Sequence, residues 1–318
     1  MTRRYISKVH GFSITDLEKL LSESCELFDN RVILEREVIG GWSNINIRGT
    51  SSDFSFILKM PWSIEPSPTY YDYLFHVSKF YGKLGVTTSP LSIGKLSNQK
   101  ETPFILLEYI DGVIYESIDA LSNQETIQFK ECLKIFHQHK PPGLHSHFSP
   151  LDYILTYHWQ VESHPGLTCC YKDLSILIDS FNKTLEAILE YAEILGPWPM
   201  TVMHGDLWIP NVVFQSSKAS LIDLESCSLG ESHYDLAHLI ESPDHLVSIP
   251  SFLLDSYERD RVEELQPIAL CWLIIWSLER LLSMDFGLVE ANLNTIESRA
   301  AVMDYTRAKI IRLNEMFS

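Results

Sequence analysis

Residues 204–211 read His-Gly-Asp-Leu-Trp-Ile-Pro-Asn, and residues 222–225, a short way downstream, read Ile-Asp-Leu-Glu. Between these stretches, two short apolar runs flank a polar turn, a pattern that predicts a β-hairpin. Antiparallel strands return to their starting edge, so Asn211, which enters the first strand, should lie beside Asp223, which leaves the second. Asp206 lies in the loop that leads into the hairpin. The spacing therefore predicts a cluster of two carboxylates and one carboxamide.

These three side chains have the chemistry that phosphoryl transfer from ATP to an alcohol requires. Asn211 and Asp223 offer hard oxygen ligands, which suit Mg²⁺ bridging phosphates. Asp206 could accept the proton of a hydroxyl as that hydroxyl attacks phosphorus. The alternative interpretation is that His204 and Asp206 only cap a loop and that Asp223 only ends a strand.

The frame His-x-Asp-Leu-x-x-x-Asn resembles the catalytic loop of protein kinases, with Gly205 in place of their arginine. Its His-Gly-Asp form resembles the aminoglycoside phosphotransferase and choline kinase superfamily of small-molecule kinases. The resemblance implies that Asp206 is the catalytic base and that His204 braces its loop. It also implies that Asn211 and Asp223 hold the metal ions.

Two further acids lie close to this frame. Residues 234–237 read Tyr-Asp-Leu-Ala, another element of the same superfamily, and the resemblance implies that Asp235 is a structural acid supporting the catalytic loop. Glu225 follows Asp223 and has no single predicted role. It could touch a second metal ion, contact the acceptor molecule or be a solvated carboxylate.

The composition is that of an ordinary globular protein. The chain has 318 residues, of which 45% are hydrophobic, enough for two lobes with separate cores. Its longest purely apolar stretch, residues 269–276, is far shorter than the ~20 residues that span a bilayer, so we predict no membrane partner. No apolar segment follows Arg3 and Arg4, which argues against a signal peptide. The cysteines form no Cys-x-x-Cys pair, which favours free thiols in a reducing cytoplasm.

The formal net charge of −17 at pH 7 argues against a nucleic-acid partner, whose phosphates need a basic surface. The same charge permits a cationic substrate, because the field of an acidic protein attracts cations. The alternative is that the charge serves only solubility, and the composition alone does not decide between the two.

The first part of the chain has the pattern of an antiparallel sheet. Runs with the residue types of strands occur at residues 32–39, 44–50 and 54–60. A helix is predicted before them at residues 15–26, where Thr15 and Glu18 have the spacing of a capping box. We expect this part of the chain to bind the nucleotide.

The turn between the first two strands reads Gly-Gly-Trp-Ser-Asn. Gly40 and Gly41 let the backbone turn tightly and approach a ligand closely. Ser43 and Asn44 add hydrogen-bond donors near the turn. Without its context this is an ordinary hairpin turn. In its context it resembles the Gly-Gly-x-Ser-Asn phosphate loop of choline-kinase-like proteins, which implies contact with the phosphates of ATP.

Lys59 ends the third predicted strand, in an otherwise apolar run that gives a charged group no partner of its own. The kinase pattern implies contact with the α- and β-phosphates, and the alternative is an exposed strand end. Kinases usually pair this lysine with a glutamate on the next helix. The helix predicted here, at residues 68–84, holds no glutamate, and Asp72 is its only acid, with Glu65 as a candidate outside it.

Residues 104–107 have the pattern of a buried strand, and residues 108–112 follow it. In the resembled superfamily this second segment joins the two lobes, and its backbone binds the edge of adenine. The resemblance therefore implies that Glu108, Tyr109 and Ile110 contribute to the nucleotide site.

The second part of the chain has mostly helical patterns, at residues 126–139, 151–161 and 172–194. His137 lies in the first of these helices, and we assign it no role. A later helix carries Trp272, Trp276 and Glu279, whose rings and carboxylate could hold a cationic acceptor. The alternative is that both tryptophans belong to the core.

We therefore predict a two-lobed α+β fold of the protein-kinase type. Residues 1–108 form the lobe with a small antiparallel sheet, which binds ATP or GTP, and residues 109–318 form the larger helical lobe with the catalytic and acceptor sites. The predicted activity is Mg²⁺-dependent transfer of the γ-phosphate to a hydroxyl of a small molecule such as an aminoglycoside, choline or ethanolamine. We expect a cytoplasmic monomer or homodimer.

Two alternative functions remain at this stage. The missing helix glutamate motivates the first, a catalytically silent kinase fold that binds a nucleotide or a partner. The second is a metal phosphohydrolase that uses His204, Asp206, Asp223 and Glu225. The metal sites of such hydrolases generally contain more histidine ligands.

Overall fold

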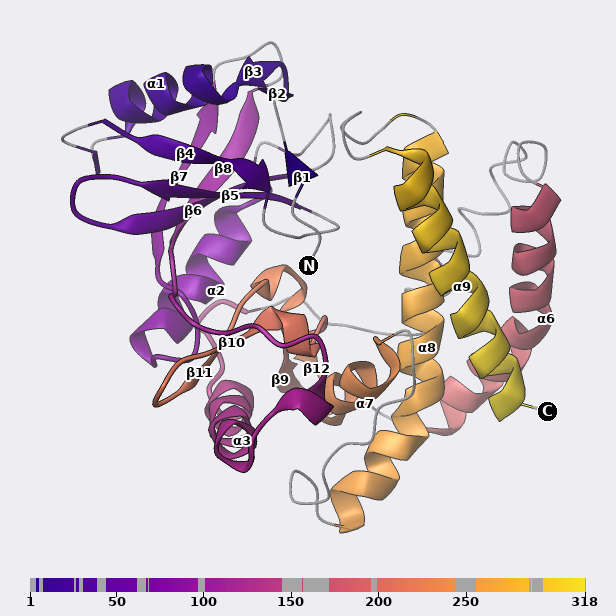
Figure 1. The fold of residues 1–318 in the computed structure, drawn as a ribbon. Coiled ribbons are helices and arrows are strands. Elements are labelled where there is room, and N and C mark those ends of the chain that lie inside the picture. The colour runs from indigo at the N-terminus through magenta and orange to yellow at the C-terminus, as the bar shows by residue number, and fades with distance from the viewer. Residues whose placement is uncertain are drawn as a thin grey trace.

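The computed structural model describes the chain except for residues 1–3, 6–7, 26, 29–30, 39–43, 62–66, 68, 97–100, 145–155, 157–171, 196–198, 244–255, 286, 288–293 and 318. Figure 1 shows a β-sheet with its helices at one side of the molecule and a group of long helices at the other. The hairpin at residues 212–221 lies below the sheet in this view, and the helix at residues 233–241 lies between it and the long helices. The predicted α+β fold with a small antiparallel sheet and a helical part is confirmed.

The main sheet has six strands in the order β1-β4-β5-β6-β8-β7, and every neighbouring pair is antiparallel. The strands are β1 (Arg4–Tyr5), β4 (Ile33–Val38), β5 (Asn44–Thr50), β6 (Ser55–Pro61), β7 (Pro90–Leu96) and β8 (Thr102–Glu108). The three strands predicted from apolar runs are present as β4, β5 and β6. Strand β7 was not predicted, because this edge strand is only partly buried and contains a glycine and a lysine.

Helix α1 (Ile14–Ser24) begins one residue earlier than predicted, and its predicted capping box is wrong. Ser13, not Thr15, is the N-cap: its hydroxyl accepts a hydrogen bond from the amide of Asp16 at 3.1 Å, and Asp16 accepts one from the amide of Ser13 at 3.0 Å. Glu18 instead accepts a hydrogen bond from the amide of Leu34 at 2.9 Å, which ties the helix to β4. Glu18 therefore serves the contact between helix and sheet, and not the helix end.

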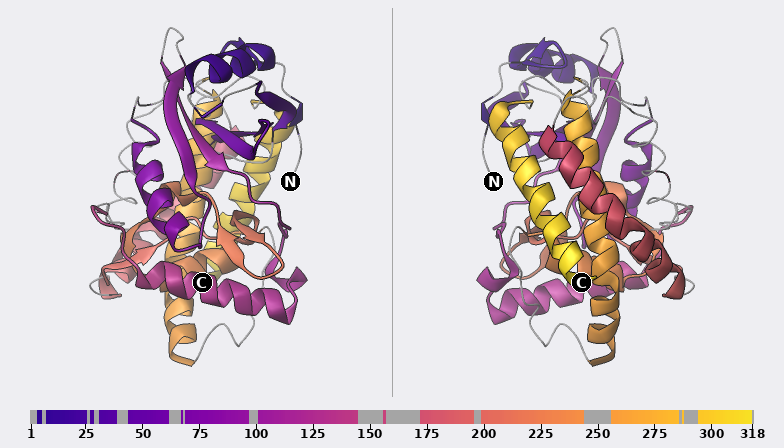
Figure 2. Two further views of the ribbon diagram at one scale, coloured as in Figure 1. Left: turned by 90° about the vertical axis from the view of Figure 1, so that its left-hand side faces the viewer. Right: turned by 90° about the vertical axis from the view of Figure 1, so that its right-hand side faces the viewer.

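Helix α2 (Asp72–Lys83) is shorter at its start than predicted and lies against the sheet part of the molecule. The helices of the second part are α3 (Asn123–Gln138), α6 (Lys172–Ile194), α7 (His233–Glu241), α8 (Ser256–Asp285) and α9 (Ile296–Met316). Two predicted helices are confirmed as α3 and α6, whereas the helix predicted at residues 151–161 lies outside the described residues except for Thr156. Helices α6, α8 and α9 pack against one another, as the right view of Figure 2 shows.

Residues 259–285 of α8 are long and apolar enough, by length and composition only, to cross a membrane. However, 67% of the most apolar window of this segment is buried inside the protein, mainly against other helices. Such burial is typical of the core helix of a globular protein. This helix also contains the predicted acceptor residues, so the packing of α8 decides which of its side chains face the rest of the site.

The remaining strands form two-stranded sheets, and 3₁₀ helices complete the described elements. They are β2 (Lys8–Val9), β3 (Phe12–Ser13), β9 (Thr201–Met203), β10 (Val212–Phe214), β11 (Ala219–Leu221), β12 (Ser228–Gly230) and the 3₁₀ helices η1 (Ile118–Ala120), η2 (Ile209–Asn211) and η3 (Leu224–Ser226). Strands β10 and β11 form the predicted hairpin, with Val212 opposite Leu221. The amide of Ile222 donates to the carbonyl of Asn211 at 2.9 Å and closes the open end of the hairpin. Asn211 and Asp223 are therefore at the same end, as predicted.

Candidate active site

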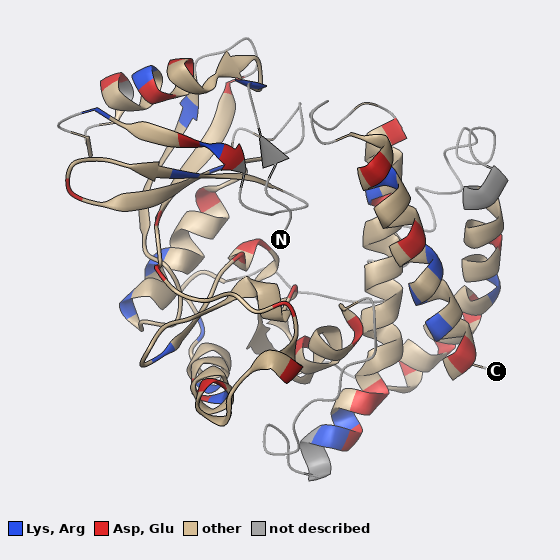
Figure 3. Cartoon of the chain, in the orientation of Figure 1, with Lys and Arg blue, Asp and Glu red and all other residues tan. Residues whose placement is uncertain are grey.

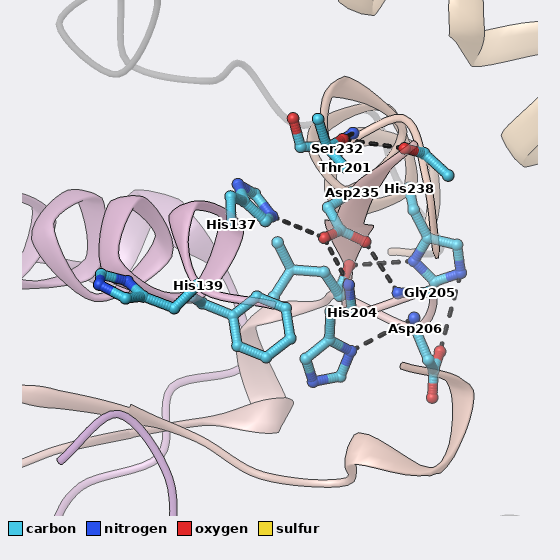
Figure 4. Close-up of polar contacts among 12 residues, drawn as sticks. His137, His139, Thr201, His204, Gly205, Asp206, Ser232, Asp235 and His238 are labelled. Atoms are coloured by element: carbon cyan, nitrogen blue, oxygen red, sulfur yellow. Dashed lines mark hydrogen bonds and ion pairs between the residues drawn. The ribbon is translucent and has the colours of Figure 1, made fainter. Parts of the chain in front are cut away.

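The catalytic loop is held in place by Asp235, a fully buried acid near the start of α7. Its two oxygens accept hydrogen bonds from the backbone amides of His204 at 2.7 Å and Gly205 at 2.9 Å. His137, from α3, lies at 2.8 Å from the same carboxylate (Figure 4). Burial opposes the charge of this acid, but its hydrogen bonds with His137 and the loop outweigh burial and lower the pKa of Asp235. The structure therefore places Asp235 where a supporting acid was predicted.

Gly205 has a φ of +81°, in the left-handed region that favours glycine. A Cβ at this position would lie 2.4 Å from the carbonyl oxygen of Ser226, which is backbone and cannot move aside easily. The loop therefore needs both the conformation and the small size of glycine. This requirement explains why the arginine of the protein-kinase frame has no counterpart at this position.

His204 connects the catalytic loop to the end of the hairpin. Its Nε2 lies 2.9 Å from the carbonyl oxygen of Ile222, and its Nδ1 accepts a hydrogen bond from the amide of Asp206 at 3.3 Å. The ring is fully buried, and burial lowers the pKa of His204. A neutral ring with its proton on Nε2 satisfies both contacts. His204 thus has the bracing position that the resemblance implied.

Asp206 lies at the centre of the site, with 38% of its side chain exposed. The amide nitrogen of Asn211 is 2.9 Å from the backbone carbonyl of Asp206 and 3.4 Å from its carboxylate. Burial and the negative charges of Asp223 and Glu225 raise the pKa of Asp206, and the hydrogen bond from Asn211 and the charge of Lys59 oppose this shift. A carboxylate of this kind binds a proton more readily than an isolated one.

Lys59 extends from β6 to the segment after the hairpin. Its side chain is 1% exposed, and its Nζ lies 2.5 Å from Asp223 and in direct contact with Glu225. Burial lowers the pKa of this lysine, but the two carboxylates outweigh burial and hold the pKa of Lys59 above its usual value. The interpretation of Lys59 as an exposed strand end is therefore wrong.

Asp223 has a φ of 62° and a ψ of 55°, a left-handed conformation that is uncommon for a residue with a side chain. Unfavourable backbone conformations of this kind concentrate at functional sites. Here the conformation lies between the end of β11 and η3, and the same turn brings Glu225 to Lys59. The two acids of the Asp-x-Glu stretch therefore converge on one cation.

The predicted phosphate loop is only partly described. Gly40, Gly41 and Ser43 lie outside the described residues, whereas Asn44 begins β5 and is 4% exposed. The side-chain nitrogen of Asn44 donates to Glu225 at 3.0 Å, and its side-chain carbonyl accepts a hydrogen bond from the hydroxyl of Tyr71. Asn44 is therefore bonded to side chains of the site, and its direct role on phosphate stays a prediction.

The segment predicted to contact adenine follows β8. The amide of Glu108 donates to the carbonyl of Ser89 at 2.9 Å, and the amide of Tyr109 donates to the carbonyl of Ser55 at 3.1 Å. Both donors already serve the sheet. The amide of Ile110 has no partner among the residues that the structure describes, so Ile110 offers the donor that adenine recognition would use.

The predicted acceptor residues Trp272, Trp276 and Glu279 are half-buried on α8. The ring of Trp272 lies 5.2 Å from the ring of His238, whose Nε2 is 3.7 Å from the carboxylate of Asp206. Trp272 is thus linked to the catalytic loop through a single side chain. Both tryptophans contact aromatic rings of neighbouring helices and also keep some exposed surface.

His238, for which no role was predicted, lies in α7 beside the catalytic loop (Figure 4). Its Nδ1 contacts the carbonyl oxygen of Leu207 at 3.0 Å and the hydroxyl of Ser242 at 2.8 Å. Burial lowers the pKa of His238 to about 4, so the ring is neutral at pH 7. A histidine within an apolar helix pattern gave no signal of this contact.

Residues 35–264 match the model of the phosphotransferase enzyme family. Because this match covers well over half of the chain, the protein belongs to that family. This membership, together with a fold shared with a choline kinase and aminoglycoside phosphotransferases, confirms the resemblance seen in the sequence.

Particular relatives extend this comparison. The choline kinase LicA of Streptococcus pneumoniae is similar in structure, with a TM-score of 0.59 and 17% identity over 94% of this chain and 96% of that one. A thermostable mutant of the aminoglycoside phosphotransferase APH(4)-Ia, in a ternary complex with AMP-PNP and hygromycin B, has a TM-score of 0.60 and 16% identity, with coverages of 94% and 98%. At such identities the likeness establishes the fold alone.

The spectinomycin phosphotransferase APH(9)-Ia, in complex with ADP and spectinomycin, has a TM-score of 0.58 and 12% identity over 95% of this chain and 97% of that one. By sequence, a protein LicA homolog of Metamycoplasma hominis is 29% identical over 84 residues. This match spans 26% of the present chain and only 32% of that protein. The relatives therefore act on different acceptors, and the likeness to them assigns none to this chain.

Proposed function

We propose that this phosphotransferase moves the γ-phosphate of ATP to a hydroxyl group of a small molecule, with Mg²⁺ as cofactor. The observation that carries the proposal is the convergence of buried Lys59 and the two acids after the hairpin on the loop that holds Asp206. Structural relatives in complex with ADP and AMP-PNP support an adenine nucleotide as the donor, with GTP as the alternative.

Asn211 and Asp223 fit a hard divalent cation. Because the amide nitrogen of Asn211 is bonded to Asp206, its carbonyl oxygen is the atom left for a cation. Asp223 offers carboxylate oxygens in a turn whose backbone is held in an unfavourable conformation. A bound Mg²⁺ would neutralise the charge of the phosphates during transfer.

The remaining steps use the side chains of the protein. Lys59 supplies a buried positive charge for the α- and β-phosphates, and Ile110 offers a backbone donor to adenine. Asp206 takes the proton of the acceptor hydroxyl, for which its partial exposure and raised pKa are suitable. Asp235, His204 and Gly205 keep the loop in position during this transfer.

The acceptor site in this proposal includes Trp272, Trp276 and Glu279 on α8, of which Trp272 contacts His238 beside the catalytic loop. Aromatic rings and a carboxylate suit a cationic acceptor such as an aminoglycoside, choline or ethanolamine. Figure 3 shows acidic residues on the sheet, on the turn after β11 and along α8 and α9, where basic residues are interspersed. A charge distributed in this way supports solubility at least as well as the attraction of a cationic substrate.

We also propose a cytoplasmic protein that acts as a monomer or homodimer, with no nucleic-acid or membrane partner. The buried free thiols of Cys25, Cys132, Cys227 and Cys271 are compatible with a reducing compartment. The high negative charge supports the exclusion of nucleic acid. Size-exclusion chromatography with light scattering would measure the oligomeric state.

The test is a screen for ADP release in the presence of ATP and Mg²⁺ over a panel of aminoglycosides, amino alcohols and sugars, with the variant D206N as the matched control. We expect release with one class of acceptor, and its loss in the variant. Nucleotide binding without ADP release for every acceptor would instead favour a silent binder. Phosphate release from esters in the absence of ATP would contradict the kinase and favour a phosphohydrolase.

A further inference from the structure

Lys59 lacks the partner on α2 that kinases usually provide. Helix α2 spans Asp72–Lys83, and its only acid, Asp72, is exposed at the helix start. No contact joins Asp72 to Lys59 among the described residues. A buried lysine must nevertheless be kept in a fixed orientation to meet a phosphate, so another group must orient it.

A continuous chain of hydrogen bonds leads from α2 to Lys59 by another route. The hydroxyl of Tyr71, the N-cap residue of α2, donates to the side-chain carbonyl of Asn44 at 2.7 Å. The amide nitrogen of Asn44 donates to Glu225 at 3.0 Å, and the same oxygen of Glu225 contacts the Nζ of Lys59. Tyr71, Asn44 and Lys59 are 2%, 4% and 1% exposed, so the contact between Tyr71 and Asn44 is shielded from water, whereas the side chain of Glu225 is 23% exposed.

The donors and acceptors of this chain agree in direction at every step. Tyrosine donates to the amide carbonyl, the amide nitrogen donates to the carboxylate, and the ammonium group donates to the same carboxylate. Glu225 is therefore held from two sides, by Asn44 and by Lys59. A carboxylate fixed in this way fixes the ammonium group in turn, as the helix glutamate does in kinases that have one.

The charges of the site explain why the contact from α2 is neutral. Lys59 already faces the carboxylates of Asp223 and Glu225, and their charges also act on Asp206. A further carboxylate from α2 would add a third negative charge around a single buried lysine, at a cost that its attraction to the lysine would not offset. A tyrosine and an asparagine connect the helix to the lysine without this cost.

We infer that Tyr71 and Asn44 are positioning residues that hold Glu225 against Lys59, and that Glu225 replaces the missing helix glutamate. Glu225 shares Lys59 with Asp223, whose carboxylate is also the proposed ligand of the cation. This inference rests on the proposed function, since it assigns to Lys59 the binding of nucleotide phosphates. It also assigns Glu225 a role that none of its predicted roles included.

The experiment compares Y71F with Y73F. Tyr73 lies on the same helix, and its hydroxyl donates to the carbonyl oxygen of Cys227, so Y73F also removes one tyrosine hydrogen bond between α2 and the segment after the hairpin. Only Y71F breaks the chain to Lys59. Isothermal titration calorimetry would measure the Kd of ADP with Mg²⁺ and the Kd of adenosine, which has no phosphates.

We expect Y71F to weaken ADP binding by about 5- to 10-fold, which is the effect of one buried hydrogen bond. Adenosine binding should stay unchanged in Y71F, because the chain acts on phosphate only. Y73F should bind both ligands like the wild type. A second variant, E225Q, should weaken ADP binding by about 10- to 100-fold, since it loses a charged hydrogen-bond partner of Lys59.

Each contrary outcome has a distinct meaning. If the wild type binds no nucleotide, the proposed function fails, whatever the variants do. If the wild type binds ADP and Y71F binds it equally well, this inference alone is overturned. An equal loss in Y71F and Y73F, or a loss of adenosine binding in Y71F, would show that docking of α2 is responsible. Tighter ADP binding by E225Q would show that Glu225 competes with phosphate for Lys59.

Discussion

The two acids next to Gly205 in the structure, Asp235 and Asp206, have opposite surroundings. Asp235 is fully buried and accepts hydrogen bonds from two backbone amides and from His137, so its pKa is lowered. Asp206 is partly exposed, has one amide at 3.4 Å from its carboxylate and faces two further acids, so its pKa is raised. Donors surround the first acid, and negative charges surround the second.

This difference separates a supporting acid from a reactive one. A carboxylate whose oxygens are satisfied by fixed donors keeps its charge and its position, and it stabilises the loop to which it is bonded. A carboxylate beside other carboxylates is destabilised until a cation or a proton arrives. Substitutions in the two acids and in the loop that joins them test this contrast.

The variant D206N should show the largest effect on activity. Replacing the base by a neutral amide should lower kcat by about 10²- to 10⁴-fold, the usual contribution of a general base. Stability should not fall, because the change removes repulsion with Asp223 and Glu225. ADP-release kinetics and thermal unfolding would measure both quantities, and near-normal turnover would remove Asp206 from the role.

The variant D235N should show the opposite pattern. Asparagine cannot accept hydrogen bonds at both oxygens of the original acid, so one buried amide of the loop would be left without a partner. We expect a loss of about 2–4 kcal/mol in the free energy of unfolding, measured by urea denaturation. An unchanged unfolding midpoint would mean that Asp235 does not support the loop.

The variant G205A tests the loop between the two acids. The added methyl group would meet the carbonyl oxygen of Ser226, and alanine disfavours a φ of +81°. A loss of about 1–3 kcal/mol in stability is expected from strain of this kind. Gly143, where a Cβ would meet nothing within 4 Å, provides the control. If G143A, which shares a positive φ but not the contact, lost as much, the contact with Ser226 would not be the cause.

The smallest expected effect concerns the pH dependence of stability. The pKa of His238 is about 4 in the folded protein and about 6.5 when unfolded, so the unfolded chain binds more protons between these values. Stability should therefore fall as pH falls through this window, with roughly 1 kcal/mol lost from His238 by pH 5.5.

The variant H238Q should remove this part of the pH dependence, and H139Q, at an exposed histidine, should not. Urea denaturation at pH 7 and pH 5.5 would measure the difference between the variants and the wild type. If H238Q and the wild type lost the same free energy of unfolding between pH 7 and pH 5.5, burial would not keep the ring of His238 neutral. His204, whose pKa is also lowered, would contribute in all of these proteins.

The predictions that succeeded from sequence depended on local pattern. Alternating apolar runs gave β4, β5 and β6, and the polar turn at residues 215–218 gave the hairpin that brings Asn211 and Asp223 to one end. The predicted capping box failed because a second residue close by could cap the same helix. Ser13 lies in the same short stretch as Thr15 and forms the cap, because a helix end can use either hydroxyl.

The contacts that organise the site were outside the reach of such patterns. The oxygen of Glu225 and the nitrogen of Asn44 are separated by 181 residues in the chain, and His137 is separated from Asp235 by 98. A tyrosine at the start of a helix, a histidine in an apolar helix and an asparagine in a strand have no periodicity that signals such pairs. Tertiary packing, such as that of α2 against η3 and of α3 against β9, brings them together.

The amino-acid sequence by itself determined the class of this protein, because the residues of a catalytic loop and its hairpin are close in the chain and their spacing is set by local backbone geometry. The tertiary structure decided how the charges are balanced. It buried Lys59 between two acids, surrounded Asp235 with donors and connected Tyr71 through Asn44 to Glu225. Burial and long-range contact set the energy of a charge, and neither is encoded in any single stretch of residues.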